Sequence, residues 1–187
     1  MSITTGKGDG GMTELFSGER VSKSDLRMDA LGALDELNSV LGLARSVATR
    51  KGLSRQILEI QRKLFVAASE LATTDGHLKF LPVRIDMDEV HRIDWQIGGY
   101  ERCVRMPRGF IVPGGTRGGA HLDHARAVCR RSERQVAALF QQKVIKSKAL
   151  LVWLNRLSDL LWLMARHEEG ASGTLPNTLP KKKGVPL

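Results

Sequence analysis

The chain has 187 residues, 42% hydrophobic and 26% charged, which predicts one folded domain and excludes a disordered chain. Its 29 Lys and Arg against 20 Asp and Glu give a net charge of +9, so we expect an anionic partner: nucleic acid, an acidic membrane or a polyphosphate. Two cysteines without zinc-ligand spacing favour reduced thiols, and no apolar run reaches the roughly 18 residues of a membrane span. No secretory leader pattern is present, so we expect a cytoplasmic protein.

A helical hydrophobic period recurs along most of the chain and predicts an all-α, up-and-down bundle of four to five helices. Residues before Ser24 lack this period, and we expect Ser24 to cap the first helix. No segment alternates convincingly, so no strand is expected. The expected helices cover about residues 24–50, 54–75, 86–106, 120–143 and 147–169.

Composition divides the chain into three parts of unequal size. Residues 1–23 are rich in Gly, Thr and Ser and are expected to be an N-terminal loop of the single domain. Residues 24–169 are expected to form the bundle, with a Gly-rich loop over 107–119. Residues 170–187 are rich in Gly, Thr, Pro and Lys, which predicts a disordered tail.

Three polar clusters are not explained by amphipathic helices. The first is the run Thr5-Gly6-Lys7-Gly8-Asp9-Gly10-Gly11-Met12-Thr13. Glycine tolerates positive φ angles, so backbone N–H groups of such a run can curl around phosphate oxygens. The run lacks the Gly-Lys-Ser/Thr ending of a Walker A loop. On the pattern alone an unstructured arm is favoured, and a phosphate loop is the alternative.

The second cluster lies on the expected fourth helix, where Arg126, Arg130 and Glu133 fall within an arc of roughly 60°. Arginine forks bind phosphate oxygens, and a carboxylate can orient an arginine or help to hold a metal ion. A solvated face with intrahelical ion pairs explains the pattern equally well.

The third cluster lies on the mostly apolar fifth helix, where Asn155, Asp159 and Arg166 align with Trp162. Buried polar groups need partners, so these face either a hydrogen-bond network or a site. The run Asp35-Glu36-Leu37-Asn38 on the first helix has the same two interpretations. Together with the basic charge, the three clusters favour a polyphosphate site, without indicating a reaction.

Six motifs between about residues 3 and 168 resemble those of the ATP:cob(I)alamin adenosyltransferases of the propanediol-utilisation type, in that family's order and spacing. They are Gly8-Asp9-x-Gly11-x-Thr13, Arg20-Val21-x-Lys23-x-x-x-Arg27, Ala30-x-Gly32-x-x-Asp35-Glu36-Leu37-Asn38, Phe110-Ile111-Val112-Pro113-Gly114-Gly115, the stretch from Ala125 to Arg134, and the stretch from Leu154 to Asp159.

The resemblance implies an enzyme that moves the 5′-deoxyadenosyl group of ATP to cob(I)alamin, built as a homotrimer with sites between subunits. One subunit would wrap the ATP triphosphate with Thr5, Lys7, Gly8, Asp9, Gly11, Thr13 and Lys23. Its neighbour would contribute Arg126, Arg130, Glu133 and Asn155, with Mg²⁺ bridging the phosphates and Glu133 an indirect ligand at most.

Two further roles are implied for the cobalamin pocket. Phe110 would close the lower face of the corrin, and Asp35 would pair with Arg126 to shape the pocket. Two departures from the family pattern are Gly6, which displaces a usual basic residue to Lys7, and Asp123-His124 near the start of the fourth helix. They put in doubt the phosphate contact and the packing of that helix start.

Two other functions are weighed against this enzyme. A relative that binds ATP and adenosylcobalamin could chiefly deliver the cofactor to an adenosylcobalamin-dependent enzyme, while a separate reductase would supply cob(I)alamin in the catalytic case. A nucleic-acid-binding bundle is suggested by the charge and by Lys181-Lys182-Lys183 but lacks aromatic platforms or a known motif. We expect neither nucleic acid nor membrane as a partner.

Overall fold

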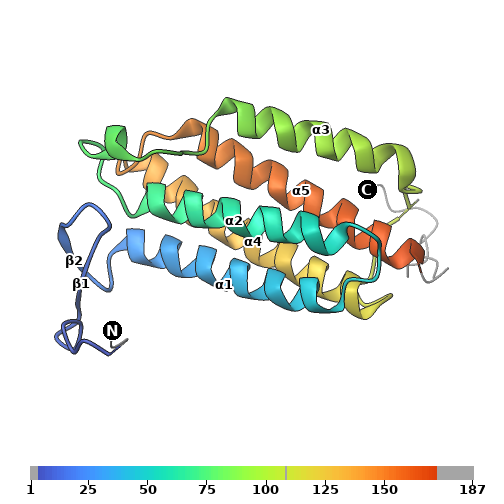
Figure 1. Cartoon of the computed structure of the whole chain (residues 1–187), viewed down its shortest axis with the longest axis horizontal. Helices are drawn as coiled ribbons and strands as arrows, with labels where there is room; N and C mark the ends of the chain where they lie inside the picture. Colours follow the sequence, from blue (N-terminus) through green and yellow to red (C-terminus); the bar gives the residue numbers. More distant parts are fainter. Residues whose placement is uncertain (1–3, 108, 172–187) are drawn as a thin grey trace, which may run out of the picture.

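A computed structural model describes residues 4–107 and 109–171 and confirms the predicted helical bundle. Five α-helices run up and down beside one another (Figure 1). They are α1 (Leu26–Val47), α2 (Leu53–Leu71), α3 (Met87–Cys103), α4 (Arg117–Gln141) and α5 (Lys148–Ala171), with a short 3₁₀ helix η1 (Leu78–Phe80) between α2 and α3. No helix within the described residues is long and apolar enough to cross a membrane.

The expectation of no strand was wrong. β1 (Met12–Glu14) and β2 (Arg20–Ser22) pair antiparallel, with Thr13 opposite Val21. Each strand has three residues, which is too short for an alternating pattern to show in the sequence. The hairpin is closed by the Leu15 N–H, which donates to the Glu19 carbonyl at 2.8 Å.

Helix caps moved several predicted boundaries. Asp25, not Ser24, caps α1, and its carboxylate accepts from the Arg27 N–H at 2.8 Å. Thr116 caps α4 by accepting from the Gly119 N–H at 3.0 Å, so the helix starts at Arg117, about three residues before the expected start. At its C-terminal end, α5 continues to Ala171, past the expected boundary of the bundle at residue 169. The predicted tail from 172 to 187 lies outside the described residues.

The core lies between α1, α4 and α5. α4 packs against both α5 and α1, while α2 covers α1 and α3 covers α5. The apolar residues that give the helices their period face this core, and Leu37, Leu41, Leu154 and Leu157 are fully buried. Each such leucine contributes about 1.5–3 kcal/mol by leaving water. The burial of these leucines agrees with the helical hydrophobic period of the sequence.

The N-terminal segment lies at the end of the bundle where α1 begins (Figure 1). Several contacts anchor it there: Leu15 is buried, the Phe16 N–H donates to the Ala72 carbonyl at 2.9 Å, and the Thr74 hydroxyl donates to the Glu19 carboxylate at 2.6 Å. Nearby, the buried Arg27 donates to the carbonyls of Leu71 and Val144, which joins the start of α1 to the end of α2 and the α4–α5 connection. The hairpin therefore has a defined place outside the bundle.

The two cysteines differ sharply in accessibility, which makes thiol labelling a test of the fold. Cys103 is exposed and Cys129 is fully buried, and burial raises the pKa of the Cys129 thiol above its usual value. We expect one thiol per native chain to react quickly with a thiol-specific reagent and the second only after unfolding. A Cys103→Ser chain should show no fast reaction; two fast thiols in the native protein would contradict this packing.

Candidate functional site

A groove of about 460 Å³ runs between α3, α4 and α5. Arg126 and Arg130 form part of its α4 wall, one helical turn apart. The full lining is Asp94, Ile97, Glu101, Met106, Arg126, Arg130, Arg156, Asp159, Trp162 and Leu163. The groove therefore has both charged and apolar walls.

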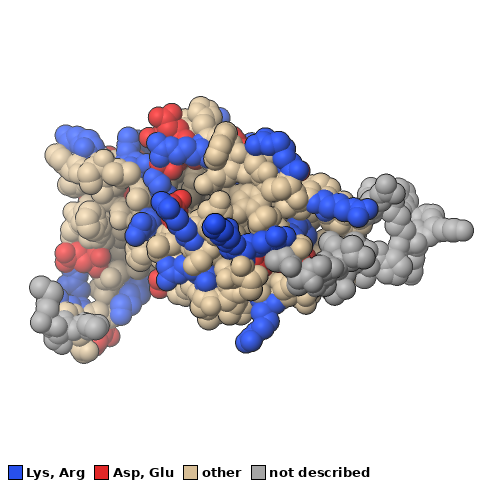
Figure 2. Space-filling model, turned by 45° about the vertical axis from the view of Figure 1, so that its right-hand side comes forward, with Lys and Arg blue, Asp and Glu red and all other residues tan. Residues whose placement is uncertain are grey.

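The side chains of Arg126 and Arg130 make no ion pair or hydrogen bond with any described residue. Asp94 of the groove pairs with Arg156 at 3.0 Å, and Glu36 of α1 pairs with Arg131, the neighbour of Arg130 in the chain. The intrahelical ion pairs of the alternative interpretation are therefore not formed by these two arginines among the described residues, while the solvated face that it expected agrees with the exposed Arg130. Figure 2 shows Lys and Arg side chains spread across one face of the molecule, in keeping with the net charge of +9. Two open guanidinium forks on a rigid helix suit an anionic ligand.

A chain of polar contacts extends the groove along α4 and α5. Asn155 donates to the Glu133 carboxylate at 3.0 Å, and its own oxygen accepts from Arg156 at 3.1 Å. Arg156 in turn reaches Asp94 on α3. The structure thus brings Glu133 and Asn155 together, as expected from their motifs. Arg156 and Asp94 were missed as groove residues, since no sequence signal distinguishes them from surface charges.

The predicted phosphate loop is folded on itself, although an unstructured arm was favoured on the pattern alone. Gly6 and Gly11 adopt positive φ angles of 69° and 76°, and the Gly11 N–H donates to the Gly8 carbonyl at 3.1 Å. The Lys23 ammonium lies against Gly8, only 2.9 Å from where a Cβ would stand, and the Lys23 N–H donates to Gly11. The folded loop therefore brings three predicted ATP ligands close together: Gly8, Gly11 and Lys23.

Within a single chain, this loop does not reach the groove. No hydrogen bond or ion pair among the described residues joins residues 4–23 to Arg126 or Arg130. The loop lies at the end of the bundle, whereas the two arginines lie in the middle of α4 (Figure 1). Thr5, Lys7, Asp9 and Gly11 are exposed, and Thr13 is half-buried. One chain thus presents the two sets of predicted ATP ligands separately.

The two residues assigned to the cobalamin pocket are both exposed. Asp35 forms no ion pair with Arg126 within the described part of the chain, while the adjacent Glu36 pairs with Arg131. Phe110, in the loop between α3 and α4, leaves 66% of its surface exposed. Phe110 is therefore not a core residue of the single chain.

The polar stripe on α5 that includes Asp159 and Arg166 contributes both to the groove and to a buried polar network, the two interpretations that the sequence left open. Asp159 and Trp162 line the groove. Arg166, one turn further along, is buried and pairs with Asp123 and Glu169. The Trp162 ring lies 5.4 Å from the Arg166 guanidinium carbon and so contacts both regions.

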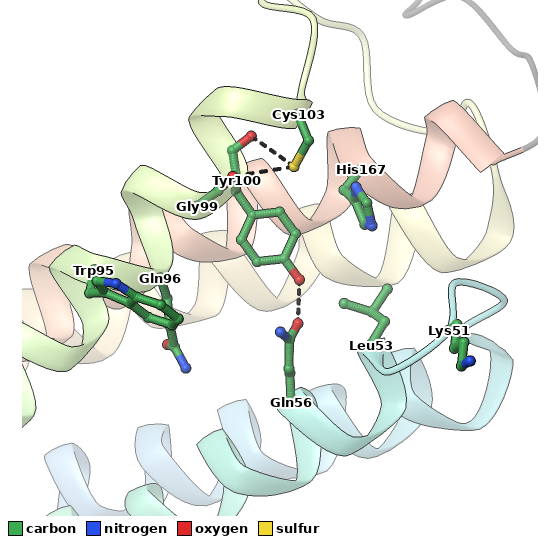
Figure 3. A pocket seen from close by; sticks show the side chains of 9 residues that line it. All are labelled: Lys51, Leu53, Gln56, Trp95, Gln96, Gly99, Tyr100, Cys103 and His167. Carbon is green, nitrogen blue, oxygen red and sulfur yellow. Dashed lines mark hydrogen bonds between the residues drawn. The ribbon is translucent and has the colours of Figure 1, made fainter.

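A second cavity, of about 280 Å³, lies between α2, α3 and the end of α5, and none of the predicted site residues line it (Figure 3). There the Tyr100 hydroxyl donates to the Gln56 side chain, and burial raises the pKa of Tyr100 to about 12. The His167 ring meets the Tyr100 ring edge-on, and burial lowers the pKa of His167 below its usual value. Both side chains are therefore uncharged at neutral pH.

Comparison with known proteins gives one consistent result. The family model for cobalamin adenosyltransferase matches residues 3–168. A corrinoid adenosyltransferase of Citrobacter freundii is 35% identical over 167 residues, which cover 89% of this chain and 94% of the relative. The corrinoid adenosyltransferase PduO of Salmonella typhimurium is 34% identical over 169 residues, and the matched region spans about half of that longer protein.

Solved structures agree with the sequence relatives. A variant of the PduO-type ATP:corrinoid adenosyltransferase from Lactobacillus reuteri, complexed with cobalamin and ATP, superposes with a TM-score of 0.88 at 30% identity. The match covers 96% of this chain and all of that one. A second variant of the same enzyme, complexed with ATP, gives a TM-score of 0.85 at 31% identity.

Proposed function

The chain belongs to the cobalamin adenosyltransferase family, and we propose on this premise that it transfers the 5′-deoxyadenosyl group of ATP to cob(I)alamin. The observation that carries the proposal is the pair of unpaired guanidinium groups, Arg126 and Arg130, on one wall of the groove. Such a pair fits the oxygens of a triphosphate.

The reaction needs no nucleophile from the protein, because the substrate's Co(I) centre attacks the ribose C5′ itself. A cobalt–carbon bond forms, the C5′–oxygen bond breaks, and triphosphate leaves with the electron pair of that bond. The protein has to position the two substrates and stabilise the negative charge that develops on the departing phosphate. Arg130 and Arg126 are fixed on a helix for this role, and the carboxylate of Glu133, one turn after Arg130 on α4, is held by Asn155.

Magnesium fits this site only as a companion of ATP. No three His, Cys, Asp or Glu side chains of residues 4–107 and 109–171 gather in a way that could hold a metal ion. Mg²⁺ commonly binds through substrate phosphates with one or two carboxylates. We therefore assign Mg²⁺ to the ATP phosphates, with Glu133 as the nearby carboxylate. When bound, Mg²⁺ would neutralise phosphate charge.

We also propose that the active unit is a homotrimer in which each site is shared by two subunits. The support is geometric: the Gly8–Lys23 loop and the arginine groove are both suited to phosphate but lie apart in one chain. In the assembly, the loop of one subunit would close over the groove of the next. We further propose that the protein acts in the cytoplasm, where ATP is abundant, and that a separate reductase supplies cob(I)alamin.

Mixing two inactive chains tests the shared site. A Lys23→Ala chain lacks its loop contact and an Arg130→Ala chain lacks its groove contact, so each alone should have little activity. Subunits exchanged between them should regain a measurable fraction of the wild-type rate, because some interfaces combine an intact loop with an intact groove. Two Lys23→Ala preparations mixed in the same way serve as the control. No recovery after confirmed subunit exchange would contradict the shared site.

The activity itself is tested by anaerobic incubation with ATP, Mg²⁺ and chemically reduced cobalamin. Formation of the cobalt–carbon bond should appear in the visible spectrum, and triphosphate should accumulate in equal amount. If ATP and adenosylcobalamin bind but no bond forms, the chain is instead a carrier that delivers the cofactor to a partner enzyme.

A further inference from the structure

A buried cluster of charges joins the start of α4 to the end of α5. Arg166 lies between Asp123, at 2.5 Å, and Glu169, at 2.8 Å. All three residues are at least 94% buried. Burying such charges carries a desolvation cost that ion pairing offsets only with good geometry, so a cluster of this kind is weak evidence for stability. Its location indicates a different use.

On one side, the cluster holds the glycine-rich turn that follows Phe110. The Gly115 backbone lies directly against the Glu169 carboxylate. A Cβ at Gly115 would lie 2.9 Å from a Glu169 oxygen, and a Cβ at Gly119 would lie 2.8 Å from the Glu169 Cγ. Only glycine allows this close approach without a shift. The Glu169 side chain therefore fixes the backbone of the turn five residues after Phe110.

On the other side, the cluster supports the wall of the groove. The Arg166 guanidinium lies over the Trp162 ring, with 5.4 Å between its carbon and the ring centre. Trp162 lines the groove together with Arg126 and Arg130. A cation over an indole ring restrains the ring's orientation when the pair is shielded from water. The same carboxylate thus acts on the Phe110 loop directly and on Trp162 through Arg166.

We propose that Glu169 is a positioning residue: it fixes the Phe110 loop and the Trp162 wall of the groove relative to each other, so that both fit the cobalamin substrate. Asp123 belongs to the same cluster, because it accepts a hydrogen bond from the Arg166 guanidinium. This contact gives a role to a residue that departs from the family pattern. The inference rests on the proposed function. To the proposed function it adds a buried carboxylate, that of Glu169, which touches neither substrate yet controls the fit of the corrin.

The adjacent Glu168 is a matched control. It is 2% exposed and also touches a glycine of the first turn of α4, Gly118. Its carboxylate, however, accepts from the backbone N–H groups of Thr49 and Arg50, at 2.7 and 3.1 Å, between α1 and α2. Losing this bond should loosen the α1–α2 connection without moving the Phe110 loop.

The test compares Glu169→Gln with Glu168→Gln. We expect both to lower the melting temperature, but only Glu169→Gln to lower the rate from cob(II)alamin with a weak reductant, by about 10-fold. The KM for ATP should stay unchanged. With Phe110 over the lower face of the corrin, Co(II) loses its lower axial ligand and becomes four-coordinate. The fraction of four-coordinate Co(II) in the ATP complex, measured by electron paramagnetic resonance, should therefore fall in Glu169→Gln. An inactive wild-type chain would instead refute the proposed function.

A second variant keeps the test decisive if Glu169→Gln does not fold. Gly115→Ala leaves every charge in place but puts a methyl group against the Glu169 carboxylate, so the turn must move. It should show the same loss of four-coordinate Co(II) with normal ATP binding. Equal kinetic effects in the Glu168 and Glu169 variants, or a Gly115→Ala chain with wild-type spectra and rates, would overturn the proposal.

Discussion

Replacing Arg130 by alanine is expected to lower kcat/KM by about 10²–10³-fold while the bundle stays folded. Arg130 is exposed on α4 and its guanidinium has no partner among the described residues, so its removal leaves no buried charge behind. The loss comes from the transition state, where one preorganised donor to the developing charge is typically worth about 2–4 kcal/mol. Steady-state kinetics with preformed cob(I)alamin measure it, and circular dichroism checks the fold.

Lysine at the same position separates charge from geometry. Arg130→Lys keeps the charge but cannot present a planar fork, so we expect most of the activity to remain lost. Arg55→Ala is the control: Arg55 is an exposed arginine on α2 that pairs with Glu59 of the same helix. A surface pair of this kind contributes about 0–1 kcal/mol, so Arg55→Ala should be near wild type. Full activity in Arg130→Ala would mean that the triphosphate leaves elsewhere.

Replacing Phe110 by alanine is expected to lower activity strongly when the reaction starts from cob(II)alamin and to leave stability almost unchanged. Because the side chain is 66% exposed, its removal creates no core cavity, and the free energy of unfolding should change by about 0.5 kcal/mol or less. As a lid on the lower face of the corrin, Phe110 would displace the lower axial ligand of Co(II). Four-coordinate Co(II) accepts an electron more readily, because no axial donor raises the orbital that the electron enters.

Two comparisons make the Phe110 result specific. Phe110→Ala should lose less activity with preformed cob(I)alamin than with cob(II)alamin and a weak reductant, and its ATP binding should be normal. Phe80→Ala is the matched control, since Phe80 is also largely exposed, at 70%, and lies in η1. An unchanged fraction of four-coordinate Co(II) in Phe110→Ala, measured by electron paramagnetic resonance, would remove the lid role.

The helices and their buried faces were predictable because helical periodicity is local. The stripe that includes Leu37 and Leu41 needs only a 3.6-residue repeat, and it is buried as expected. Helix geometry likewise places Arg126 and Arg130 on one face whatever the rest of the chain does. The starts of α1 and α4 were misplaced by one to three residues, because cap choice depends on which side-chain oxygen reaches a free N–H.

Family membership was also predictable, since the motifs that carry it are short and ordered along the chain, and the family model matches residues 3–168. The roles of single residues were not predictable in the same way. Asp159 and Arg166 lie on one stripe of α5, yet one lines the groove and the other is buried between two carboxylates. Their surroundings differ because Asp159 faces the groove between α3, α4 and α5, whereas Arg166 meets Asp123 near the start of α4.

Only the tertiary structure decided which charges are free. Arg126 and Arg130 form no ion pair among the described residues, whereas two other arginines do: Arg156 pairs with Asp94, and Arg166 pairs with Asp123. Those pairings join residues 43 and 62 positions apart on different helices, so no local pattern contains them. A sequence determines which residues share a helix face, since that depends on neighbours three and four positions away. Which charge meets its partner depends on how the helices pack, and that is a property of the whole fold.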